Sequence, residues 1–68
     1  MVIGFVVKGD EWYPAPQLRE AARARARTVL DRSMARLGLV ISGEPRETAK
    51  DDGWGGILLT LTAQGRLA

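Results

Sequence analysis

The chain has 68 residues, enough for one domain, and it contains no cysteine and no histidine. These absences exclude disulfides and the common zinc sites as sources of stability. The formal net charge is only +2, from ten basic and eight acidic residues, which is less than most nucleic-acid-binding modules carry. Because a domain this small buries only about 60% of its unfolded surface, we expect self-association to add stability.

The first predicted element is a strand over residues 1–8, where Val, Ile and Phe dominate until Gly9. Apolar residues stand on both alternating faces of this strand, and such a strand is normally covered on both faces. Residues 11–16 contain two prolines and are predicted to form a connecting loop.

Residues 17–37 are predicted to form a helix about 30 Å long, because they are rich in Ala, Arg and Leu and contain no Gly or Pro. Gly38 is expected to end this helix as a left-handed cap. A helical wheel places one apolar stripe against the sheet. The stripe contains Leu18, Ala22, Ala26, Val29, Leu30, Ser33 and Leu37.

Shorter elements follow the helix. Residues 39–42 are predicted as a second strand and residues 43–45 as a turn, with continued pairing over residues 46–49 as an alternative. Residues 50–56 are predicted as a polar, glycine-rich loop. Residues 56–62 form the predicted third strand, and residues 63–68 a tail.

These elements predict an α+β protein with a single domain over residues 1–68. Its expected architecture is a two-layer β-α-β-β arrangement, with one long basic helix packed on a small three-stranded mixed sheet. The first two strands are expected to run parallel through a right-handed crossover. Since one helix covers only one face, we expect a homodimer through the open sheet face or a strand edge.

The positive charge is concentrated on the predicted helix, where residues 17–37 hold six arginines and two acidic residues. Like charges four residues apart repel, and Glu20 is expected to offset this by pairing with Arg23, as Asp31 is with Arg27. Two rows of arginines flank the apolar stripe. They are Arg19, Arg23 and Arg27 on one side and Arg25, Arg32 and Arg36 on the other.

The arginine rows predict an anion-binding surface, because guanidinium groups bind carboxylates and phosphates through paired hydrogen bonds. An acidic protein surface is the favoured partner, and nucleic acid bound by the same helix is the alternative. A third interpretation is a solvated helix whose arginines reflect GC-rich codons. That codon bias is typical of an actinobacterium or of a virus that infects one.

Three of the four aromatic residues, Trp12, Tyr13 and Trp54, fall in predicted loops. Tryptophan and tyrosine are common anchors at interfaces and can also stack on bases. In a small domain, such residues also fold back over the core. Both interpretations stay open at this stage.

Nothing in the sequence predicts catalysis, a cofactor or a metal site. The usual general base and the cysteine nucleophile are absent. The loop at residues 51–56 lacks the Gly-Lys-Ser/Thr of a phosphate loop and the alternating acidic ligands of a calcium loop.

The sequence therefore predicts a small non-catalytic interaction protein, and its short length and codon bias fit a viral or mobile-element accessory protein. It would dock its arginine helix and its loop aromatics on an acidic protein, with a structural subunit of a larger assembly as a further alternative. We expect no membrane span and no signal peptide, and a cytoplasmic location.

Overall fold

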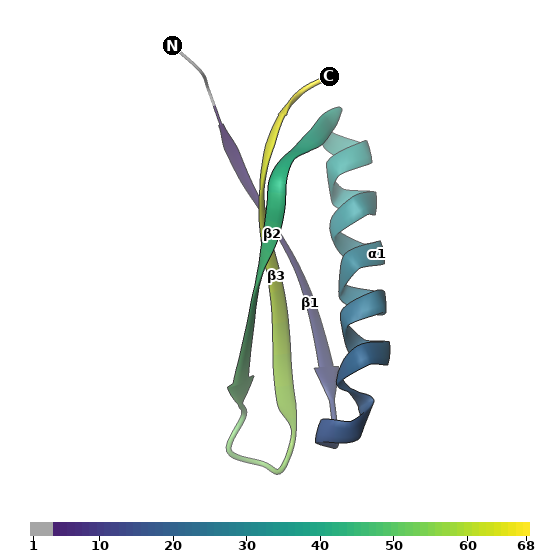
Figure 1. Cartoon of the computed structure of the whole chain (residues 1–68), viewed down its shortest axis with the longest axis vertical. Coiled ribbons are helices and arrows are strands. Elements are labelled where there is room, and N and C mark those ends of the chain that lie inside the picture. Colours follow the sequence, from purple (N-terminus) through teal and green to yellow (C-terminus); the bar gives the residue numbers. More distant parts are fainter. Residues whose placement is uncertain (1–3) are drawn as a thin grey trace.

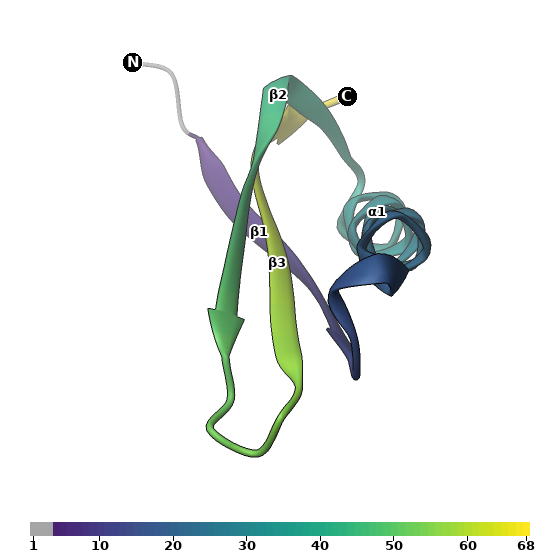
Figure 2. The same cartoon turned by 60° about the horizontal axis from the view of Figure 1, so that its bottom comes forward.

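The computed structural model describes residues 4–68 as a three-stranded sheet with one helix lying along it (Figure 1). The elements are strand β1 (Phe5–Tyr13), a 3-10 turn η1 (Pro16–Leu18), helix α1 (Arg19–Leu37), strand β2 (Leu39–Asp51) and strand β3 (Ile57–Leu67). A view turned by 60° shows α1 nearly end-on, beside one face of the sheet (Figure 2). The predicted α+β class is confirmed.

The predicted mixed sheet is wrong, because the strand order is β1-β3-β2 and both pairings are antiparallel. The strands β1 and β2 run in the same direction, but β3 lies between them. Because β3 separates them, β1 and β2 do not form the predicted parallel pair.

The helix ends where the sequence predicts. Gly38 adopts a left-handed conformation with φ 71°, and its N–H donates to the carbonyl oxygen of Ala35 at 3.1 Å. The start differs from the prediction, because residues 16–18 form a 3-10 turn before α1 begins at Arg19.

The buried side of α1 is narrower than the helical wheel predicts. Ser33 is half-buried, whereas Leu18, Val29 and Leu37 are exposed. Because α1 packs mainly against β1 and β3 and less against β2, only one row of side chains at spacing four reaches the sheet. This row is Ala22, Ala26, Leu30 and Met34.

Gly9 was predicted to end the first strand, but it lies inside β1 and is buried. A Cβ at this position would meet the backbone oxygen of Ala26 and, at 2.9 Å, the backbone nitrogen of Leu30. Glycine therefore serves here to let the helix backbone come close to β1. Residues 1–3 of the predicted strand lie outside the described residues.

The second and third strands are longer than predicted. Residues 43–45 form a bulge inside β2 rather than a turn, and the register resumes at Arg46 opposite Thr62. Gly43 allows this bulge, since its φ is 82°. The predicted tail at residues 63–68 is mostly part of β3, where it pairs with the start of β2.

The core lies between α1 and the sheet face that the helix covers. Tyr13 belongs to it, with only 1% of its surface exposed, which agrees with the interpretation that this residue folds over the core and not with the one that it contacts a partner. Tyr13 is the last residue of β1 and faces the same side as Val7 and Gly9. The buried apolar residues are Val7, Tyr13, Ala22, Ala26, Leu30, Met34, Leu39, Leu59, Leu61 and Ala63.

Within residues 4–68, no helix combines the length and the apolar character that a membrane crossing requires.

Candidate binding surface

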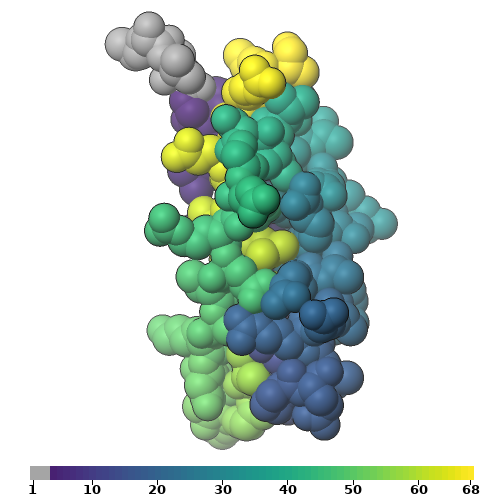
Figure 3. Space-filling model, in the orientation of Figure 1, coloured from purple at the N-terminus to yellow at the C-terminus, as the bar shows by residue number. Residues whose placement is uncertain are grey.

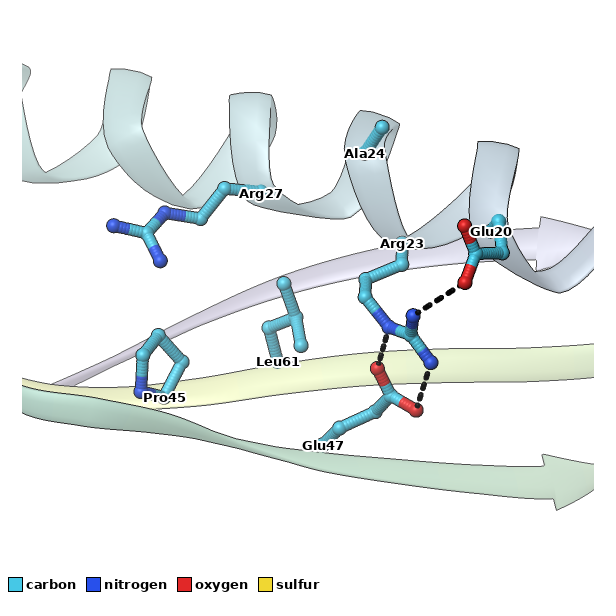
Figure 4. Close-up of a pocket in the computed structure, with 7 residues that line it drawn as sticks. All are labelled: Glu20, Arg23, Ala24, Arg27, Pro45, Glu47 and Leu61. Atoms are coloured by element: carbon cyan, nitrogen blue, oxygen red, sulfur yellow. Dashed lines mark hydrogen bonds and ion pairs between the residues drawn. The ribbon is translucent and has the colours of Figure 1, made fainter.

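Two helix arginines bind one carboxylate on the sheet. Glu47 of β2 accepts hydrogen bonds from Nε and Nη2 of Arg19 at 3.1 and 2.7 Å. It also accepts two from Arg23, whose Nη1 lies 3.4 Å from Glu20 (Figure 4). The Glu20–Arg23 pair was predicted from the sequence, whereas the pairing with Glu47 was not.

The two guanidinium groups determine the charge state of Glu47. Hydrogen bonds from Arg23 and then Arg19 lower the pKa of this carboxyl from 4.5 to about 2. Its side chain is 21% exposed, because the arginines cover it. Glu47 therefore stays ionised in any ordinary buffer and fastens α1 to β2.

The other side of the helix is fastened to β1. Nε of Arg25 donates to Glu11 of β1 at 2.8 Å. A further pair lies within the helix, where Nε of Arg27 donates to Asp31, one turn further along α1, at 3.0 Å. The Arg27–Asp31 pair confirms a prediction. Four of the six helix arginines thus bind carboxylates of the same chain. Arg32 and Arg36 have no carboxylate within 4 Å in the described part of the chain.

Replacing Glu47 by glutamine should lower the free energy of unfolding by about 1 kcal/mol at pH 7, the upper range for exposed ion pairs. Because folding depresses the pKa of Glu47, its contribution is present above pH 4.5 and is lost as the pH falls through about 2. Urea unfolding of both proteins at pH 7, 4 and 2 measures this. A difference that stays constant between pH 7 and pH 2 would contradict the assignment.

An open groove of about 400 Å³ runs between α1 and β2. Atoms of β3 are visible in it between the helix and β2 (Figure 3). Its apolar lining comes from Ala24, Pro45 and Leu61, and the ion pairs of Arg23 and Glu47 lie along it (Figure 4). Since its charged groups already have partners, the groove offers a ligand little unpaired charge.

The sheet face opposite the helix has a different character. Residues that directly oppose one another in the register share a face, and the neighbours of buried Val7 and Leu61 point away from α1. This surface, which we call the open face, is mostly polar. From β1 it contains Val6, Lys8, Asp10 and Trp12. From β3 it contains Leu58, Thr60, Thr62, Gln64 and Arg66. From β2 it contains Val40, Ser42, Arg46, Thr48 and Lys50.

The unpaired basic residues gather on the open face. Of the ten basic residues, six have no carboxylate within 4 Å in the described part of the chain, and four of these six belong to the open face. Asp10 is the acidic strand residue among them, and Glu44 lies in the β2 bulge nearby. The four basic residues are Lys8, Arg46, Lys50 and Arg66.

The register arranges these groups in rows. Lys8 and Arg46 stand on either side of Thr62, in the middle of the face. Two rows further along, Trp12 and Lys50 stand on either side of Leu58. The first row therefore has a hydroxyl between two cationic side chains, and the second has an aliphatic side chain between an aromatic and a cationic one.

One carboxylate binds the side chain of Trp12 and the backbone of Trp54. Asp52 accepts hydrogen bonds from the indole N–H of Trp12 at 2.7 Å, and from the backbone N–H groups of Trp54 at 2.7 Å and Gly56 at 3.0 Å. The backbone bond to Trp54, followed by the Trp12 bond, lowers the pKa of Asp52. The β2–β3 loop is thus tied to the end of β1.

The sequence grouped three aromatics that the structure separates. Trp12 lies on the open face and is 52% exposed, and Trp54 is 92% exposed in the β2–β3 loop. Tyr13 is in the core. Trp12 was placed in a loop by the sequence but belongs to β1.

The geometry defines a small α+β domain with one helix-covered and one open sheet face. Comparison with protein-family models, curated proteins and solved structures finds no significant match to this chain. The side chains described above are therefore the basis of the proposed function.

Proposed function

We propose that this protein is a non-catalytic binding domain that contacts nucleic acid through the open face of its sheet. One observation carries the proposal: the unpaired basic side chains lie mainly on that face and not on the helix. Phosphates are recognised mainly by such lysine and arginine groups, with hydroxyl and amide side chains as additional donors. Lys8, Arg46 and Thr62 supply both kinds of donor in one row.

This proposal moves the contact surface away from the helix that the sequence suggested. An anion that binds Arg19 or Arg23 must compete with Glu47, and one that binds Arg25 must compete with Glu11. An anion that binds the basic residues of the open face does not have to displace a carboxylate of the described chain.

The second candidate is docking of α1 on an acidic protein surface. Arg32 and Arg36 favour it, because no carboxylate of the described chain lies within 4 Å of either. Arg36 lies in the last turn of α1, where a cation stabilises the helix by interacting with its dipole. A folding role therefore accounts for Arg36 without a partner.

The absence of histidine and cysteine from the sequence supports a non-catalytic role. A cytoplasmic location, an accessory role in a virus or mobile element, and a place in a larger assembly stay predictions.

We propose that self-association uses a strand edge rather than the open face. Two open faces in contact would bring the four basic residues of one copy against those of another, away from water, which is unfavourable. The outer edge of β1 is a regular edge, whereas a bulge at residues 43–45 interrupts β2. Light scattering across a range of concentrations measures the association, and a monomer throughout would contradict it.

A pair of double variants tests the proposed surface. Lys8→Gln with Arg46→Gln removes two unpaired charges from the open face, and Arg32→Gln with Arg36→Gln removes two unpaired charges from the helix. For a single-stranded oligonucleotide, loss of two phosphate contacts should reduce the slope of log K against log salt concentration by about 1.4. We expect this reduction for the sheet variant and a slope close to the parent's for the helix variant.

Fluorescence anisotropy with a labelled oligonucleotide at several salt concentrations gives both slopes. No binding to any oligonucleotide at low salt would refute nucleic-acid binding. Equal losses in the two variants would refute the assignment to the sheet.

A further inference from the structure

We infer that the indole of Trp12 is a preformed platform on which one unpaired base of a single-stranded nucleic acid stacks. The inference rests on the proposed function and names its ligand class. In this inference Trp12 stacks on a base, in addition to the electrostatic contacts that the basic residues make with phosphates.

The position of the Trp12 ring is set from two directions. Its N–H is held by Asp52 at 2.7 Å. Its ring packs on Gly56, where an added Cβ would overlap Nε1, Cε2 and Cζ2 of the indole. One side of the ring thus rests on the backbone, while 52% of the residue's surface remains exposed. Such a ring loses little conformational freedom when a flat ligand stacks on it.

The surroundings of Trp12 suit a strand with unpaired bases. Lys50 stands two strands away in the same row, across Leu58, and can bind a phosphate beside the stacked base. The row of Lys8 and Arg46 is four residues away, or about 13 Å. At the spacing of a strand in duplex DNA, about 3.4 Å per phosphate along the axis, about four nucleotides cover that distance, and an extended single strand needs fewer.

A base can stack on Trp12 only where it is not already paired and stacked in a duplex. Stacking on aromatic side chains is the general means by which proteins bind single strands without reading their sequence. We therefore expect single-stranded DNA to bind more tightly than a duplex of the same length and salt conditions, with little dependence on base sequence.

Two substitutions of Trp12 isolate the aromatic plane. Trp12→Phe and Trp12→Leu both remove the hydrogen bond to Asp52, so they should change the β2–β3 loop in the same way. Only the phenylalanine retains a flat ring. We expect Trp12→Leu to bind an eight-nucleotide oligothymidine about 5- to 150-fold more weakly than the parent, the range for one lost base stack. Trp12→Phe should retain most of the affinity, and thermal unfolding shows whether both variants fold.

The protein's own fluorescence gives a second readout. The chain has two tryptophans, so in Trp54→Phe the tryptophan emission, excited at wavelengths that tyrosine does not absorb, comes from Trp12 alone. We expect oligothymidine to quench this emission, and a duplex to quench it much less.

The outcomes separate this inference from the proposed function. If both Trp12 variants bind as the parent does while Lys8→Gln with Arg46→Gln binds weakly, the platform is refuted and the proposed function stands. If no oligonucleotide binds, both are refuted. If polyglutamate binds as tightly as oligothymidine with the same dependence on Trp12, the contact of Trp12 is not a base stack and the platform is refuted.

Discussion

Replacing Gly9 by alanine should lower the free energy of unfolding by about 3 kcal/mol, the upper end of the usual range for overpacking. The added Cβ would meet backbone atoms of α1, the oxygen of Ala26 and the nitrogen of Leu30. Backbone atoms in a helix cannot rotate away, so the whole helix has to move off β1. A domain of this size has only about 3–5 kcal/mol of net stability, so we expect much of the variant to be unfolded at 37 °C.

Gly4→Ala is the matched control. Among residues 4–68, no atom other than those of its chain neighbour lies within 4 Å of a Cβ at Gly4, and its backbone conformation does not require glycine. Urea unfolding followed by circular dichroism compares the two variants, and Gly4→Ala should unfold at nearly the parent's midpoint. Equal midpoints for Gly9→Ala and the parent would mean that α1 does not approach β1 as closely as described.

The example of Gly9 shows which parts of the fold the sequence could predict. Local signals sufficed for the α+β class and for the end of the helix at Gly38, since a left-handed cap depends on the residue itself. The sequence around Gly9 was misleading, because the residues next to a glycine do not show whether it ends a strand or lets a helix pack closely against the strand. Only the packing of α1 on β1 distinguishes them.

Strand lengths were underestimated for a similar reason. Residues 43–45 have the composition of a turn, but the pairing of β2 with β3 on both sides absorbs them as a bulge. The strand order was also beyond local reasoning. The sequence contains no signal that places β3 between β1 and β2, and the predicted mixed sheet was wrong for this reason.

The candidate site depended on the same long-range information. Pairs within one helix, Glu20 with Arg23 and Asp31 with Arg27, could be predicted because the helix period fixes them. Glu47 is 28 residues from Arg19, and no periodicity connects them. Because the pairing with Glu47 could not be predicted, the helix arginines were predicted to be available for binding to a partner.

The open face became visible only once the register was known. Lys8 and Arg46 are 38 residues apart in sequence, yet they share a row through Thr62. The alternation of residues along each strand could have indicated polar faces for β1 and β3. The number of arginines on the helix instead suggested a binding surface, but three of the six hold the two layers together and a fourth, Arg27, pairs with Asp31 within the helix.

The helical wheel placed Val29 and Leu30 in one apolar stripe, and substitutions at these adjacent positions distinguish the wheel from the structure. Leu30 is fully buried beside Gly9, whereas Val29 is 39% exposed. We expect Leu30→Ala to lower the free energy of unfolding by about 2–5 kcal/mol, because it removes a core side chain and leaves a cavity. On a domain with so little stability to lose, this loss should leave a largely unfolded chain.

Val29→Ala should change the free energy of unfolding by no more than about 0.5 kcal/mol, as is usual for surface positions. The lost contact area is small, and alanine has the higher helix propensity. Urea unfolding of both variants gives the comparison. Similar losses at the two positions would show that α1 buries a wide stripe, as the wheel suggested, and that the helix is rotated relative to its described position. Such a rotation would also break the alignment of Arg25 with Glu11 and of Arg23 with Glu47, and with it the argument that the helix charge is used within the chain.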